Sequence, residues 1–130
     1  MPSYLETSDF QKSRAYSPAV ITQGGKIIWL AGQTGLRDQD GKDLSGDFEA
    51  QVAAVFHFIN QTLSRVGGSL ENIVTMTVFI NDPRNGDKFV ELRGKYFPSG
   101  NFPASAMITV SNFARPGMLL EIQAVGCIGG

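Results

Sequence analysis

Residues 47–66 read DFEAQVAAVFHFINQTLSRV and carry the clearest helical pattern of the chain. Apolar residues recur there every three or four positions, which puts them on one face of a helix: Phe48, Val52, Val55, Phe56, Ile59, Leu63 and Val66. Asp47 or Ser45 can cap the start of this helix, and Gly67-Gly68 suits the left-handed turn that ends many helices. The stretch therefore predicts an amphipathic helix lying on a core.

The chain after this helix predicts three strands and a second helix. Residues 72–81 (NIVTMTVFIN) are dominated by β-branched and aromatic side chains, which favour a central strand. Asp82-Pro83 is typical of a helix start, and Phe97-Pro98 of its end. One face of that helix would carry Phe89, Leu92, Arg93 and Tyr96. Residues 104–111 and 118–127 predict two final strands.

The chain before the first helix predicts a β-hairpin. Residues 19–22 and 26–31 are β-branched or apolar, and Gln23-Gly24-Gly25 between them tolerates the positive φ of a tight turn. Residues 34–46 are rich in Gly and Asp and predict a loop. Residues 1–15 show no pattern and are expected to form an N-terminal arm.

These elements give the order β-β-α-β-α-β-β, an α+β fold with two helices on one face of the sheet. The strand at 72–81 is apolar in both phases of its alternation, with Val74, Met76, Val78 and Ile80 in one phase and Ile73 and Phe79 in the other. A strand with one face in water instead alternates apolar and polar residues. We therefore expect the second face to be buried against other copies of the chain, with pockets where the copies meet.

Composition limits the classes of protein that fit. The 130 residues suit one domain, residues 1–130, and the net charge of −1 gives no general attraction to nucleic acid. A single cysteine excludes an internal disulfide or a thiolate zinc site. No apolar run is long enough to span a membrane, and the first twenty residues lack the apolar region of a secretory signal. The expectation is a cytoplasmic domain without membrane or nucleic-acid partners.

Most isolated polar side chains have ordinary structural explanations. His57, the only histidine, is expected on the exposed part of the first helix, and no serine or cysteine partner for a triad can be placed beside it. Cys127 lies in an apolar strand, where free cysteine behaves as a small hydrophobic residue. Glu121 is different, because it interrupts the apolar run Met118–Val125. It either alternates with Gln123 on a solvated face, or it is a pocket carboxylate that holds and deprotonates a water molecule.

Five ordered segments resemble one family. They are Tyr16-Ser17-Pro18-Ala19-Val20, Leu30-Ala31-Gly32-Gln33, residues 74–80 (VTMTVFI), Asn101-Phe102-Pro103-Ala104 and residues 120–125 (LEIQAV). Together they are similar to the Rid family, also called YjgF/YER057c/UK114, of enamine/imine deaminases. The resemblance implies a chorismate-mutase-like fold whose sheets pack into a trimeric barrel, with pockets between subunits.

The resemblance also implies a reaction and a set of site residues. Family members hydrolyse reactive enamines or imines of small metabolites to a carbonyl compound and ammonia, and need no metal or other cofactor. Glu121 matches the carboxylate that positions water, and Tyr16 a pocket tyrosine; both are expected to be catalytic. The expected substrate-binding residues are Gly32, Phe89, Arg93, Ser105 and Met107.

One departure from the family pattern concerns the substrate carboxylate. The archetypal deaminases carry an arginine directly after the Pro-Ala pair, but here Ser105 follows Pro103-Ala104. A serine supplies one neutral donor and cannot replace a two-pronged guanidinium. Arg93 can compensate if the second helix turns it into the pocket; otherwise it is a surface residue or part of an intersubunit ion pair. Arg14, Arg37 and Arg115 are further candidates that the sequence does not rank.

Three functions stay open at this point. The first is a hydrolase acting on C=N bonds, with Glu121 orienting water. The second is a non-catalytic small-molecule-binding or regulatory member of the family, which the change at Ser105 favours. The third, an endoribonuclease or translation inhibitor, is disfavoured by the near-neutral charge and the lack of a basic aromatic stripe.

Overall fold

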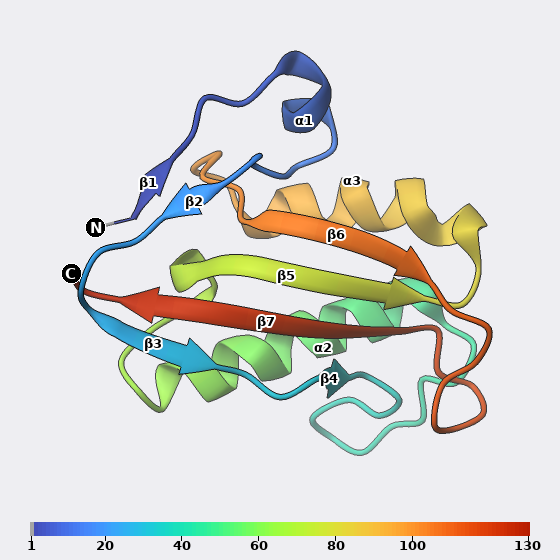
Figure 1. The fold of residues 1–130 in the computed structure, drawn as a ribbon. Helices are drawn as coiled ribbons and strands as arrows, with labels where there is room; N and C mark the ends of the chain where they lie inside the picture. The colour runs from blue at the N-terminus through green and yellow to red at the C-terminus, as the bar shows by residue number, and fades with distance from the viewer. Residues whose placement is uncertain (1) are drawn as a thin grey trace.

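The sheet and its two covering helices follow the order expected from the sequence, with additional short elements at the N-terminus (Figure 1). The computed structural model describes residues 2–130. The elements are β1 (Ser3–Tyr4), α1 (Asp9–Ser13), β2 (Val20–Ile21), β3 (Lys26–Trp29), β4 (Gln33–Thr34), α2 (Phe48–Ser64), β5 (Ile73–Ile80), α3 (Gly86–Tyr96), β6 (Ala104–Thr109) and β7 (Leu120–Ile128). Single 3₁₀ turns, Leu70–Asn72 and Pro83–Asn85, precede β5 and α3.

The main sheet is mixed, with strand order β3-β7-β5-β6 and β4 paired to β7 beyond this path. Strands β5 and β6 run parallel, and the other pairs are antiparallel. Helices α2 and α3 lie on one face of this sheet (Figure 1), as the sequence predicts. Phe56 of α2 stacks on Tyr96 of α3, with ring centroids 4.3 Å apart, so the two helices share one core with the sheet.

Local signals predict the start of α2 correctly, whereas α2 ends at Ser64 and α3 begins only at Gly86, after a 3₁₀ turn. The Asp47 carboxylate accepts a hydrogen bond from the Ala50 backbone N–H and caps α2, and Gly67 adopts a φ of +84° just beyond its end. Asp82 accepts from the Arg84 N–H where the turn leading into α3 begins. Val66 lies beyond the last turn of α2 and is 39% exposed, so the predicted apolar stripe ends at Leu63.

Two predictions about the N-terminal third are wrong. Residues 20–21 and 26–29 do not pair as a hairpin: β2 pairs with β1, and β3 pairs with β7 from the other end of the chain. The turn itself is real, since Gly24 and Gly25 have φ of +66° and +79°. The expected arm, described here from residue 2 to residue 15, is not plain, because Ser8 and Gln11 form a capping box that starts α1.

The predicted alternation of β5 is half right. Met76, Val78 and Ile80 point into the helix-covered core and Phe79 points away, as expected. An irregularity in the pairing between Ile73 and Thr75 shifts the register, and Ile73 is therefore fully buried while Val74 is only half-buried.

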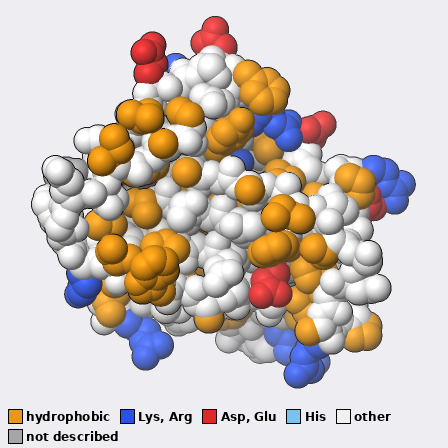
Figure 2. All heavy atoms as spheres, in the orientation of Figure 1, with side chains coloured by type: hydrophobic (Ala, Val, Ile, Leu, Met, Phe, Trp, Pro, Cys, Tyr) orange, Lys and Arg blue, Asp and Glu red, His pale blue; other side chains and the backbone are white. Residues whose placement is uncertain are grey.

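The other face of the sheet carries exposed apolar side chains. Pairing places Trp29, Val125 and Thr75 on this face, and Phe79 with Ile108 farther along it. Trp29 is 77% exposed and Ile108 44% exposed. Figure 2 looks onto this face and shows hydrophobic side chains gathered over the strands, with an acidic side chain among them. Within residues 2–130 no helix or loop covers this surface, which we call the open face.

Candidate functional site

Arg93 lies inside the protein rather than on its surface. It follows Phe89 by four residues on α3, so both face inward, and only 2% of Arg93 is exposed. Nη1 donates a hydrogen bond to the Ser105 hydroxyl at 2.7 Å, and Nη2 donates to the Arg14 carbonyl at 2.9 Å. The guanidinium carbon lies 5.2 Å from the centroid of the Phe89 ring, within the range of a cation–π contact.

The charge of Arg93 has no counter-ion within residues 2–130. The ion pairs found in residues 2–130 involve Arg14, Arg84 and Lys88, and Arg93 takes part in none of them. Its buried Nε also has no hydrogen-bond partner. Burial, together with repulsion from Arg14, lowers the pKa of Arg93 to about 10, and Tyr16 opposes this shift. A buried positive charge that lacks an acidic partner is a place where an anion would bind.

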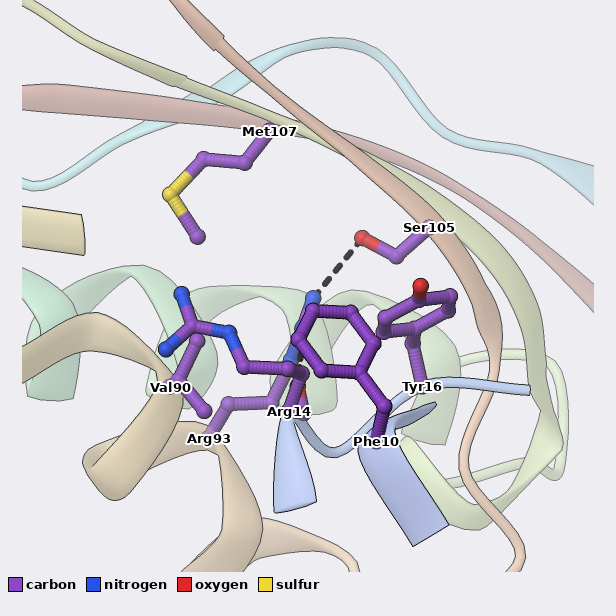
Figure 3. A pocket seen from close by; sticks show the side chains of 7 residues that line it. All are labelled: Phe10, Arg14, Tyr16, Val90, Arg93, Ser105 and Met107. Atoms are coloured by element: carbon purple, nitrogen blue, oxygen red, sulfur yellow. Dashed lines mark hydrogen bonds between the residues drawn. The ribbon is translucent and has the colours of Figure 1, made fainter. Parts of the chain in front are cut away.

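Arg93 opens onto a cavity of about 260 Å³ between α1, α3 and β6, which we call the arginine pocket (Figure 3). Its lining residues are Phe10, Arg14, Tyr16, Val90, Arg93, Ser105 and Met107. A guanidinium has five N–H groups, and the two hydrogen bonds above leave three of them without an acceptor within residues 2–130. The pocket therefore combines a fixed cation with apolar walls, and it suits a small organic anion.

The backbone after α1 completes this pocket. Ala15 is buried with a φ of +57°, which is uncommon for a residue other than glycine. This turn lies between the Arg14 carbonyl, which accepts from Arg93, and the Tyr16 side chain in the pocket. Ser17 then pairs with the start of β6: its N–H donates to the Pro103 carbonyl at 3.0 Å. The N-terminal segment is thus anchored as a pocket wall.

Glu121 lies elsewhere, on the open face. It is half-buried on β7, opposite Phe79 of β5, and lines a hollow of about 390 Å³ with Phe79, Val110, Asn112, Phe113, Ala114 and Gln123. Its carboxylate lies over Gly32, where an added Cβ would be 3.2 Å from the Glu121 Cδ and closer still to Oε2. A side chain at position 32 would therefore force this carboxylate to move.

The residues that the sequence proposed for one site form two groups. Tyr16, Arg93, Ser105 and Met107 line the arginine pocket, and Phe89 supports Arg93 from below. Glu121 and Gly32 contact each other on the open face and line no part of that pocket. Ser105 and Met107 pair with Met76 and Val78 and share their side of the sheet, whereas Glu121 shares the side of Phe79. One chain does not bring the two groups together.

The structure also ranks the remaining arginines. Arg14 lines the arginine pocket, whereas Arg37 and Arg115 line a separate hollow beside Phe58. Phe10 and Val90 are pocket residues that the sequence analysis missed. The capping box at Ser8 and Gln11 could have indicated the helix that carries Phe10, but nothing local indicates that this helix borders the same cavity as α3.

The fold and these two groups define a class: α+β domains with a helix-backed mixed sheet, an apolar open face and a small anion pocket at its edge. The family described as Endoribonuclease L-PSP matches residues 6–128. The chain belongs to this family, which is also known as Rid or YjgF/YER057c/UK114.

Individual relatives agree with this assignment. A RutC family protein of Pyrococcus abyssi is 30% identical over 110 residues, covering 85% of this chain and 84% of the relative. The crystal structure of YyfB, a Rid family protein of unknown function from Yersinia pestis, has a TM-score of 0.86 at 23% identity and covers 98% of both chains. Rv2704 of Mycobacterium tuberculosis, a YjgF/YER057c/UK114 member, has a TM-score of 0.68 at 25% identity, covering 98% of this chain and all of that one.

Among residues 2–130, no helix is both long and apolar enough to cross a membrane. No group of three or more His, Cys, Asp or Glu side chains within this range is arranged to hold a metal ion.

Proposed function

We propose that this protein is a hydrolytic deaminase of reactive enamines or imines that carry a carboxylate, yielding a carbonyl compound and ammonia. The observation that carries this proposal is the hydrogen bond from Arg93 to Ser105. It brings a guanidinium from α3 to the strand position where the archetypal deaminases have their own arginine. Family membership supports the reaction class. Because Arg93 of α3 supplies the guanidinium, β6 can carry Ser105 where the archetypal deaminases carry an arginine.

The proposed active site forms between copies of the chain. The arginine pocket and the Glu121 carboxylate lie on opposite sides of one sheet, so a single copy cannot present both to one substrate. The open face, with Trp29 77% and Ile108 44% exposed, supplies an apolar surface on which a second copy can pack. A trimer of this kind would bring Glu121 of one copy toward the pocket of the next.

The proposed chemistry is addition of water to C=N followed by loss of ammonia. Arg93 binds the substrate carboxylate and fixes the imine carbon. The Glu121 carboxylate takes a proton from water as the oxygen lone pair forms a bond to that carbon and the C=N π pair moves to nitrogen. Protonation of nitrogen and collapse of the resulting amino alcohol break the C–N bond, release ammonia and leave the carbonyl. Water supplies the oxygen, and no oxidant or reductant is consumed.

The test is a coupled assay with Glu121→Gln. An amino-acid oxidase generates 2-imino acids, semicarbazide traps them, and the loss of semicarbazone measures hydrolysis by the protein. We expect the wild type to suppress trapping and Glu121→Gln to have lost at least about 100-fold in rate, the lower range for removal of a general base. Glu91→Gln, which removes an exposed carboxylate from α3, is the matched control and should behave as the wild type.

A second candidate function is binding without turnover. It is favoured by the separation of Glu121 from the pocket within one chain, because a molecule that does not assemble would keep only the anion site. Tight binding of a 2-oxo acid to a wild-type protein that hydrolyses no imine would support this function. Turnover that requires Glu121 would exclude it.

A further inference from the structure

The arginine pocket contains a second cation besides Arg93. Arg14 lines the same cavity, and its side chain is 33% exposed, whereas Arg93 is almost fully enclosed. In Figure 3 the guanidinium of Arg14 lies on the side of Val90 and Met107, while that of Arg93 points to Ser105. The two cations thus occupy different parts of one small cavity.

The pocket has more positive than negative charge. Arg14 pairs with Asp87 at 2.7 Å, but the Asp87 side chain is 92% exposed, and such pairs contribute little in water. Arg93 has no acidic partner within residues 2–130, and its Nε is buried without an acceptor. Within residues 2–130 the two guanidinium groups of the pocket have one carboxylate partner, the exposed Asp87 on Arg14, and Arg14 can exchange Asp87 for a ligand at small cost.

We infer that the arginine pocket selects small dicarboxylates, with one carboxylate on Arg93 and the other on Arg14. Val90 and Met107 would contact the carbon chain between the two carboxylates. A cavity of about 260 Å³ lies just below the range of about 300 Å³ and more that drug-sized ligands occupy, and it suits an acid of four to six carbons. This inference rests on the proposed function for the role of Arg93. It adds that the natural substrate carries a second carboxylate.

The test compares two probes that differ only in that carboxylate. The probes are 2-oxoglutarate and 2-oxopentanoate, which have equal chain length, and calorimetry on the full chain measures the dissociation constant of each. We expect the wild type to bind 2-oxoglutarate about tenfold more tightly, as one added charge-assisted hydrogen bond predicts. Arg14→Gln should bring the ratio of the two constants close to one. The backbone carbonyl of Arg14, not its side chain, holds Arg93, so this substitution leaves that contact in place.

The control variant is Lys12→Gln, which removes one positive charge from α1 without altering the pocket lining. It should keep the tenfold preference. Equal affinities in the wild type, a preference that survives in Arg14→Gln, or a preference that disappears in Lys12→Gln would each overturn the inference. The outcome is separable from that of the proposed function. A dicarboxylate preference without imine turnover contradicts only the deaminase, and turnover without a preference contradicts only the second carboxylate site.

Discussion

Replacement of Arg93 by methionine tests whether this arginine binds a ligand or stabilises the fold. Methionine keeps an unbranched side chain over Phe89 but removes the charge and all five donors. A buried arginine that braces the fold is expected to be costly to remove, at about 3–5 kcal/mol for one partner of a buried pair. The contacts of Arg93 predict a much smaller loss.

The magnitude follows from two opposing contributions. Lowering the pKa of Arg93 from the ordinary arginine value to about 10 corresponds to roughly 3 kcal/mol against the charged form, at about 1.4 kcal/mol for each tenfold change. Methionine removes this penalty. It also removes two hydrogen bonds, at about 1 kcal/mol net each, and a cation–π contact of about 0.5–1 kcal/mol. The free energy of unfolding of Arg93→Met should therefore lie within about 1 kcal/mol of the wild-type value.

Urea unfolding followed by far-ultraviolet circular dichroism measures this difference. Both proteins are compared at one protein concentration, because assembly would make stability concentration-dependent. An equal slope of the free energy of unfolding against urea concentration shows that both proteins expose the same amount of surface when they unfold. Calorimetry with 2-oxopentanoate on the same samples should show binding to the wild type only. A loss of 3 kcal/mol or more, or retained binding, would refute the reasoning that Arg93 serves a ligand rather than the fold.

Three other predictions follow from the same geometry. Gly32→Ala would place a methyl group against the Glu121 carboxylate, so imine turnover should fall at least about tenfold while the circular dichroism spectrum is unchanged; wild-type turnover would contradict the close contact. Ile108→Asp puts a charge on the open face, and sedimentation velocity should show smaller species than for the wild type, whereas Lys95→Asp on exposed α3 should not change the assembly. Because the pKa of Arg93 is about 10, the cationic fraction falls from about nine-tenths at pH 9 to about one-tenth at pH 11, and 2-oxopentanoate should bind about tenfold more weakly at the higher pH; constant affinity over that interval would contradict the lowered pKa.

The parts of the fold that the sequence predicts correctly depend on local chemistry. Helix α2 follows from its apolar period and the Asp47 cap, and β5 from its β-branched run. The failed hairpin shows the limit of such signals. Gly24 and Gly25 do form a turn, but β3 pairs with β7, about 100 residues away in sequence. A Cβ on Gly25 would lie 2.8 Å from the Gly129 carbonyl, so the turn is shaped by the C-terminus, which no local pattern reveals.

The same distinction between local signals and long-range contacts applies to the candidate site. The spacing of Arg93 from Phe89 on the second helix is a local relation, and it indicates that Arg93 is buried. Its hydrogen bond to Ser105 joins a helix to a strand, and its bond to the Arg14 carbonyl depends on the positive φ of Ala15. The sequence could propose Arg14, Arg37 and Arg115 together, but only the tertiary contacts of Arg14 with Asp87 and Arg93 of α3 place Arg14 alone of these three in the pocket.

The absence of an acidic partner for Arg93 is informative because α3 has acids available. Asp87 and Glu91 both lie within two turns of Arg93, yet they pair with Arg14 and Lys88 at the surface. An arginine kept only for the fold would be balanced by such a carboxylate, since an unpaired buried charge is costly. Here the helix places its cation inside and its acids outside, so an anion that balances Arg93 comes from outside residues 2–130, either as a bound carboxylate or as an acidic side chain of a neighbouring copy.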